Sequence, residues 1–171
     1  AVIYSIVTDR FYNGDKANDQ PDRDPKVPWQ LNYQGGDWEG IIQKIKSGYF
    51  TEMGVNVLWL SPVYDNPDKS FESQFLENGR KITGYHGYWP VSFTRTEEHF
   101  GSMEKLKELV SVAKQNNLRI MLDAVLNHVH QEHPLWKEKP QWFGALTLPD
   151  GRKNLRLFDE RPLDTWFDEF M

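Results

Sequence analysis

The chain has 171 residues, of which 39% are hydrophobic and 26% are charged, which are the proportions of an ordinary globular domain rather than a disordered segment. Its net charge of −5 argues against a nucleic-acid partner, because neutralising phosphates requires an excess of Lys and Arg. The absence of cysteine excludes disulfides and thiolate zinc sites, and no apolar run approaches the roughly 20 residues that cross a membrane.

The predicted elements alternate between strands and helices. Short apolar runs, rich in β-branched residues, predict three buried strands, at residues 2–7, 55–60 and 120–122. Apolar residues at helical spacing predict a helix from Trp38 to Tyr49, with Asp37 as its N-cap and Gly54 as its stop. A second helix is predicted to begin after Ser102 and to end at Asn116-Asn117.

This order favours an α/β fold with a parallel sheet covered by helices on both faces. The long loops, residues 9–36 and 63–100, follow the carboxyl ends of strands, as the loops that carry the active site of a (β/α)₈ barrel do. A doubly wound sheet has the same polarity, so periodicity leaves both folds open. A complete barrel needs about 250 residues. We therefore expect the chain to be the N-terminal part of a longer protein.

The first long loop contains a set of oxygen-bearing side chains. Asn13, Asp15, Asn18 and Asp19 lie within seven residues of one another, and Asp37 follows at the start of the predicted helix. Calcium takes about six to eight oxygen ligands from carboxylates, amides and backbone carbonyls, so these residues predict a cation site. Turn formation is the alternative, because Asn, Asp and Gly are also the commonest turn residues.

Two further clusters follow later strands. The segment 84–89 interleaves glycines with aromatic residues and His86, which suits either a stacking platform for a flat ligand or loop packing. The segment 123–128 begins with Asp123 at the end of the third strand, where a barrel has its active site, although a helix cap or core carboxylate is the alternative. The remaining polar candidates are expected to be solvated surface groups: His99, His130, His133 and the pair Glu97-Glu98.

Taken together, these segments resemble the α-amylase superfamily of glycoside hydrolases, and most closely its cyclodextrin glucanotransferase-like and bacterial maltogenic branches. The resemblance is nearly continuous from Val2 to about Val129. The stretches that carry it occur in the family's order and spacing: Ile3-Tyr4, Thr8 to Phe11, Gly35 to Trp38, Met53 to Val55, Leu58 to Pro62, Tyr85 to Trp89, and Asp123 to His128. It implies the N-terminal part of a (β/α)₈ TIM barrel over residues 1–128, and the start of an inserted irregular domain over residues 129–171.

The resemblance also implies roles for individual residues. Residues 13 to 37 match one calcium cage of the family, through Asn13, Asp15, Asn18, Asp19, the Gly35 carbonyl and Asp37. Asn127 matches a ligand of a second calcium that several relatives lack. Tyr88 matches the aromatic residue that stacks under a sugar, His86 and His128 match histidines that bind its hydroxyls, and Trp89 matches a supporting residue. Asp123 matches a structural aspartate of the active-site floor.

The family is retaining, with a nucleophile and an acid–base carboxylate about 5 Å apart. Those carboxylates and a third one follow the fourth, fifth and seventh strands, in motifs that are absent from this sequence. The resemblance therefore implies part of an enzyme that acts on α-1,4-glucans such as starch and maltodextrins, inactive by itself. It also favours an extracellular or periplasmic location. A non-catalytic amylase-like carbohydrate-binding or interaction domain is the alternative.

Overall fold

The computed structural model describes residues 1–72, 77–143 and 151. The chain forms two compact units, Ala1–Trp136 and Lys137–Met171, and the parallel sheet and the helices that cover it lie within the first. The boundary expected between residues 128 and 129 remains a prediction, and most of the expected inserted domain, including Leu163 to Asp168, lies outside the described residues. None of the described helices is both long and apolar enough to pass through a membrane.

A three-stranded parallel sheet forms the centre of the first unit. Its strands are β1 (Ile3–Ile6), β2 (Val57–Leu60) and β7 (Arg119–Leu122), in the order β1-β2-β7, which confirms the three predicted strands. Because parallel strands point the same way, the loops that follow them all leave the sheet at the carboxyl ends of its strands. The first long loop, the second long loop and the segment after β7 therefore begin at the same end of the sheet.

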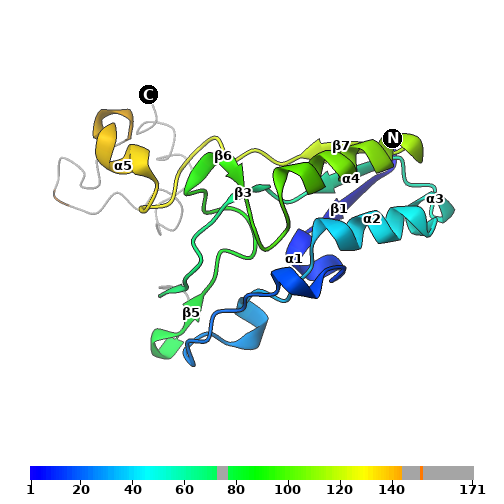
Figure 1. Ribbon diagram of the computed structural model, residues 1–171. Coiled ribbons are helices and arrows are strands. Elements are labelled where there is room, and N and C mark those ends of the chain that lie inside the picture. Colours follow the sequence, from blue (N-terminus) through cyan, green and yellow to red (C-terminus); the bar gives the residue numbers. More distant parts are fainter. Residues whose placement is uncertain (73–76, 144–150, 152–171) are drawn as a thin grey trace. The chain divides into compact units, whose positions relative to one another are not determined.

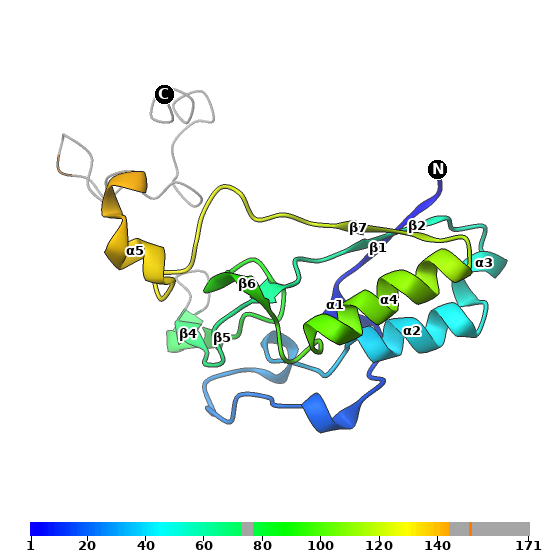
Figure 2. The same ribbon diagram turned by 45° about the horizontal axis from the view of Figure 1, so that its top comes forward.

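Two helices lie side by side along one face of this sheet (Figures 1 and 2), α2 (Trp38–Lys46) and α4 (Met103–Gln115). As predicted, Asp37 caps α2 by accepting the Gly40 N–H, and Ser102 caps α4 by accepting the Lys105 N–H. Their apolar stripes close over the inward residues of the strands. The resulting core includes Trp38, Ile41, Ile42, Ile45, Leu58, Leu60, Leu106, Leu109 and Ala113. Each large side chain buried there contributes about 1.5–3 kcal/mol.

Helix α2 is shorter than the helix predicted from Trp38 to Tyr49. It ends at Lys46, Gly48 takes a left-handed φ of 84°, and a separate turn, α3 (Tyr49–Glu52), follows before Gly54. A left-handed residue cannot continue a right-handed helix, so Gly48 breaks the predicted single element into two. The break lets Phe50 pack into the core from a different direction.

The other face of the sheet is bare within the described residues. Side chains alternate between the two faces of a strand, so Ile3, Trp59 and Met121 point away from the helices, and they are 52%, 40% and 37% exposed. The expectation that helices cover both faces is therefore wrong for this part of the chain. An apolar face of this kind needs a further layer of structure to cover it.

The loops carry more regular structure than predicted. The first contains α1 (Thr8–Phe11), η1 (Lys16–Asn18) and η2 (Trp29–Leu31). The second contains antiparallel pairs, which its mixed sequence did not indicate: β3 (Tyr64–Asp65) with β6 (Ser92–Thr96), and β4 (Phe71–Glu72) with β5 (Lys81–Ile82), with η3 (Glu77–Gly79) between the last two. After β7, a region expected to be irregular forms α5 (Pro134–Glu138) and η4 (Pro140–Trp142).

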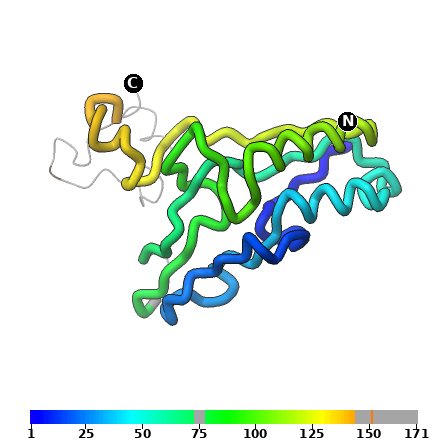
Figure 3. The backbone as a smooth tube through the Cα atoms, in the orientation of Figure 1, coloured from blue at the N-terminus to red at the C-terminus, as the bar shows by residue number. Residues whose placement is uncertain are grey.

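The two long loops lie side by side beyond the sheet (Figure 3). The Lys81 N–H donates to the Lys26 carbonyl, and the Thr83 N–H donates to the Leu31 carbonyl, both at 3.0 Å. These bonds join segments more than 50 residues apart in sequence. They place the predicted cation residues and the aromatic segment 85–89 in one continuous layer of loops.

Candidate functional site

The structure brings the predicted cation residues of the first loop together. We call residues 13–20 the cation loop. The Asn13 Nδ2 amide lies 2.9 Å from both carboxylate oxygens of Asp19, and its Oδ1 is left buried. Neither that oxygen nor Oδ1 of Asn18 has a hydrogen-bond partner among the described residues, although both are buried. A buried carbonyl oxygen without a partner costs about 1–3 kcal/mol, and a bound cation would satisfy it.

Gly35 lies directly against these side chains. A Cβ at Gly35 would lie 2.2 Å from Asp19 Oδ1 and 2.4 Å from Asn13 Nδ2, and its φ is +83°. Only glycine allows the backbone to approach so closely in this left-handed conformation. The position therefore holds the main chain of Gly35 beside the side chains with which it is predicted to share an ion.

Asp37 anchors the loop from the start of α2. Its fully buried carboxylate accepts N–H groups from Gly14, Asp15 and Gly40, at distances between 2.6 and 3.2 Å. Burial raises its pKa, although these hydrogen bonds oppose the shift. Asp37 thus serves as a helix cap and a loop anchor, whichever further role it has.

Asp15 is exposed and accepts the Ala17 N–H at 3.0 Å, which is the turn chemistry that the sequence offered as an alternative. Two features go beyond turn formation. The amide oxygens of Asn13 and Asn18 are unpartnered, and no Lys or Arg in the described part of the chain forms a salt bridge with Asp15, Asp19 or Asp37. Uncompensated carboxylates beside orphaned amide oxygens are the donor set that suits a hard cation.

The second group of predicted residues converges on Tyr88. Its backbone N–H donates to His86 Nδ1 at 3.0 Å, and its carbonyl accepts from His128 Nε2 at 2.8 Å. Its hydroxyl donates to Asp123 Oδ2 at 2.5 Å, and this hydrogen bond, with burial and the Asp123 charge, raises the pKa of Tyr88 to about 12. The segment 85–89 and the segment after β7 are therefore joined at a tyrosine whose side chain is still partly open to solvent.

The hydrogen bonds also fix the proton positions of the two histidines. Burial, and then the charges of Arg10 and His128, lower the pKa of His86 to about 4, so its ring is neutral near pH 7. Because its Nδ1 accepts from Tyr88, its proton lies on Nε2, which is free to donate. In His128 the roles are reversed: Nε2 donates to Tyr88, and the buried Nδ1 has no partner among the described residues.

Trp89 and Asn127 lie beside this group. The Trp89 N–H donates to Asn66 Oδ1 at 2.7 Å, and its ring meets the His86 ring edge-on at 4.8 Å. That contact fits the supporting place predicted for Trp89. Asn127 is exposed and directly precedes His128. Its assignment to a second calcium therefore stays a prediction.

Asp9 and Arg10 join the two groups, and the sequence reasoning gave neither a functional role. The Asp9 carboxylate accepts the N–H groups of Gln34 and Gly35, and its burial raises its pKa to about 6 despite these bonds. The Arg10 guanidinium lies 3.7 Å from the centre of the Tyr85 ring and also donates to two carbonyls of the first loop. The signals in the sequence were a polar pair shortly after a predicted strand and its place in the stretch Thr8 to Phe11, which carries the family resemblance.

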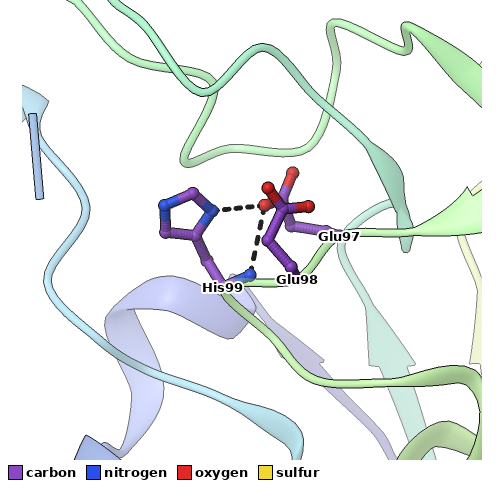
Figure 4. Close-up of side chains that lie close together, drawn as sticks. All are labelled: Glu97, Glu98 and His99. Carbon is purple, nitrogen blue, oxygen red and sulfur yellow. Dashed lines mark hydrogen bonds and ion pairs between the residues drawn. The ribbon is translucent and has the colours of Figure 1, made fainter. Parts of the chain in front are cut away.

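The expectation that Glu97, His99 and His133 are solvated is wrong. Glu97 is completely buried, His99 is 4% exposed and His133 is 6% exposed, while His130 is half-buried. His99 Nδ1 lies 2.5 Å from Glu97 Oε1 (Figure 4), and His99 Nε2 lies 3.1 Å from the Gln20 carbonyl. Burial lowers the pKa of His99, but its hydrogen bond and ion pair with Glu97 outweigh burial and raise it. Both ring nitrogens thus have protein partners, although Glu97, Glu98 and His99 together resemble a metal-binding cluster.

Comparisons with known proteins identify the family to which the chain is similar. The cyclomaltodextrin glucanotransferase of Thermoanaerobacterium thermosulfurigenes is 36% identical over 163 residues, which is 90% of this chain and 22% of the relative. An alpha-amylase of Niallia circulans is 41% identical over 130 residues, covering 74% of this chain and 24% of the relative. The chain thus spans less than a quarter of the length of these two relatives.

Solved structures give the same result. The alpha-amylase of Geobacillus thermoleovorans, solved in complex with acarbose, superposes with a TM-score of 0.66 at 32% identity, covering 98% of this chain and 31% of that one. The family model for the catalytic domain of alpha amylase matches residues 5–149. With that match over most of its length, the chain belongs to the alpha-amylase family and is a fragment of its TIM-barrel catalytic domain.

Proposed function

We propose that this chain supplies the calcium-binding and glucan-binding wall of a retaining glycoside hydrolase or transglycosylase that acts on α-1,4-glucans such as starch and maltodextrins. The observation that carries the proposal is the fixed position of Tyr88, which is held at its backbone N–H, its carbonyl and its hydroxyl by His86, His128 and Asp123. Relatives named as alpha-amylases and cyclomaltodextrin glucanotransferases support the substrate class.

The chemistry of this wall suits a neutral sugar. The Tyr88 side chain belongs to a residue that is 42% exposed, and an aromatic face can stack on the apolar face of a glucose ring. The neutral His86 offers Nε2–H as a donor, and His128 holds the Tyr88 carbonyl through its own Nε2. A donor beside an aromatic ring can bind a sugar hydroxyl, and the hydrogen bonds that hold both residues in place reduce the entropy lost on binding.

Calcium fits the first group of residues. Asn13, Asp15, Asn18, Asp19, the Gly35 carbonyl and Asp37 would hold it, and the buried amide oxygens of Asn13 and Asn18 are the observation that favours it. The ion would supply positive charge to the acidic loop and would stabilise the native state by mass action. Asp9, which binds the Gly35 N–H, and Arg10, which packs on Tyr85, would couple the loop to the aromatic segment.

The proposed chemistry needs groups that this sequence does not contain. The family's three active-site carboxylates would come from later strands of the complete (β/α)₈ barrel, and residues 129–171 would begin the inserted domain. Those further strands would also cover the bare sheet face at Trp59 and Met121. We therefore expect no turnover from the 171-residue chain alone.

The test is an assay of the protein at its full natural length with maltoheptaose, beside a Tyr88→Ala variant. We expect shorter or transferred glucans from the wild type, and a loss of at least tenfold in kcat/KM for the variant. Binding of maltoheptaose without products would instead identify a non-catalytic carbohydrate-binding domain. If the wild type neither binds maltoheptaose nor forms products from it, the proposal is overturned.

A further inference from the structure

The buried pair Glu97–His99 contacts the first loop on both sides of the predicted cation site. His99 Nε2 lies 3.1 Å from the carbonyl of Gln20, the residue directly after Asp19. The imidazole also contacts the ring of Tyr33, which stacks parallel to it with 3.7 Å between centroids. Tyr33 precedes Gly35 by two residues. One side chain therefore touches both stretches that supply the predicted ligands.

Glu97 fixes the orientation of this histidine. Its Oε1 lies 2.5 Å from His99 Nδ1, its Oε2 accepts the Asn66 N–H at 2.9 Å, and its own N–H donates to the Val63 carbonyl at 3.1 Å. Both acceptors around the ring, a carboxylate and a carbonyl, need a donor, so His99 donates from both nitrogens. The pair is thus anchored in the second loop and reaches across to the first.

His99 and Gln20 both line a small cavity. A cavity of about 130 Å³ lies between the end of the cation loop, the segment 33–35 and His99, and Asp19 and Gly35 are among its lining residues. His99 borders this cavity without being one of the predicted ligands. If its contact with Gln20 were lost, nothing in the described second loop would hold that carbonyl in place.

We propose that Glu97 and His99 are positioning residues for the cation site: they hold Gln20 and Tyr33 so that the cation loop and Gly35 keep the spacing that binds calcium. This inference rests on the proposed calcium site and names a determinant of its affinity outside the ligand set. It also assigns a role to two buried polar groups that the glucan-binding wall does not use.

The experiment measures calcium affinity by titration calorimetry on chelator-treated protein of full natural length. The variants are His99→Gln and Glu97→Gln, together with their combination. The matched control is Asp65→Asn, because Asp65 is a buried carboxylate that pairs with Arg95 across the antiparallel strands β3 and β6 and, among the described residues, has no hydrogen bond or ion pair with the cation loop. The free energy of unfolding without calcium is measured for each variant, so that general destabilisation is separated from loss of affinity.

We expect each of the two substitutions to weaken calcium binding about tenfold, as for the loss of one hydrogen bond to a charged group. The combination should weaken it little further, since both changes release the same contact. The control should bind calcium like the wild type even where its stability falls as much. Equal affinity in His99→Gln and Asp65→Asn would overturn the inference.

A wild type that binds no calcium would refute the proposed cation site rather than the positioning role. In that case hydrogen exchange of the backbone amides of residues 16–20 decides the second question. Faster exchange in His99→Gln than in Asp65→Asn would support the role of the pair, and identical exchange in the two variants would overturn it.

Discussion

Gly35→Ala gives the sharpest test of the cation site, because it perturbs two predicted ligands at once. The added Cβ would lie 2.2 Å from Asp19 Oδ1 and 2.4 Å from Asn13 Nδ2. An ordinary carbon–oxygen contact needs about 3.3 Å, so the Asp19 carboxylate has to move by about 1 Å. Calcium–oxygen distances vary over only about 0.3 Å, so such a movement removes Asp19 from any coordination sphere.

The backbone contributes a second, separable cost. Gly35 has φ +83°, and an L-residue in the left-handed region costs about 1–2 kcal/mol. Gly54→Ala is the matched control, since Gly54 has φ +72° and nothing lies within 4 Å of its added Cβ. The control therefore carries the backbone cost without the contact with Asp19 and Asn13.

The assay is urea unfolding of the protein, with chelator and with saturating calcium. In chelator, we expect Gly54→Ala to lose about 1–2 kcal/mol of the free energy of unfolding, and Gly35→Ala to lose at least as much, because its Cβ also displaces the Asn13–Asp19 pair. In calcium, the wild type and Gly54→Ala should gain the same stabilisation, while Gly35→Ala should gain less by about 1.4 kcal/mol or more, which corresponds to a tenfold or larger loss of affinity. An equal gain in both variants would refute the reasoning from Gly35, and no gain in any of the three proteins would refute the ion itself.

Two further predictions concern the aromatic group and the second loop. Tyr88→Phe removes only the hydroxyl bonded to Asp123 and should weaken maltoheptaose binding less than Tyr88→Ala, which also removes the ring; equal losses measured by calorimetry would exclude stacking as the main contribution. Glu98 is exposed as a residue, but partial burial of its carboxyl, a hydrogen bond with Asp68 and the charge of Glu97 raise its pKa to about 7 from its ordinary 4.5. A raised acid pKa stabilises the fold below pH 4.5 and loses that contribution as the pH rises through about 7, so Glu98→Gln should be more stable relative to the wild type at pH 8 than at pH 4. Urea midpoints that shift equally at both pH values would contradict this assignment.

Much of the central architecture follows from local sequence. The apolar runs predict β1, β2 and β7, and the helical spacing with Asp37 and Ser102 predicts where α2 and α4 begin. These signals succeed because a cap or a periodic face is decided within a few neighbouring residues. The split between α2 and α3 was missed because the sequence pattern continues through Gly48, whose left-handed backbone breaks the helix.

The candidate site was also predictable only in the features that neighbouring residues decide. The oxygen-rich loop and the segment around Tyr88 could be found from residue types at short spacing, and the structure brings the members of each group into contact, with Asn127 left exposed. Tertiary structure alone decided that Glu97 and His99 are buried, since the bond from His99 to Gln20 spans 79 residues and no local pattern encodes it. A charged pair is solvated by default, and it becomes internal only where distant segments supply its hydrogen-bond partners. The sequence by itself therefore determined which residues have the chemistry of a cation and sugar site, whereas the fold decided which of them meet and what holds them there.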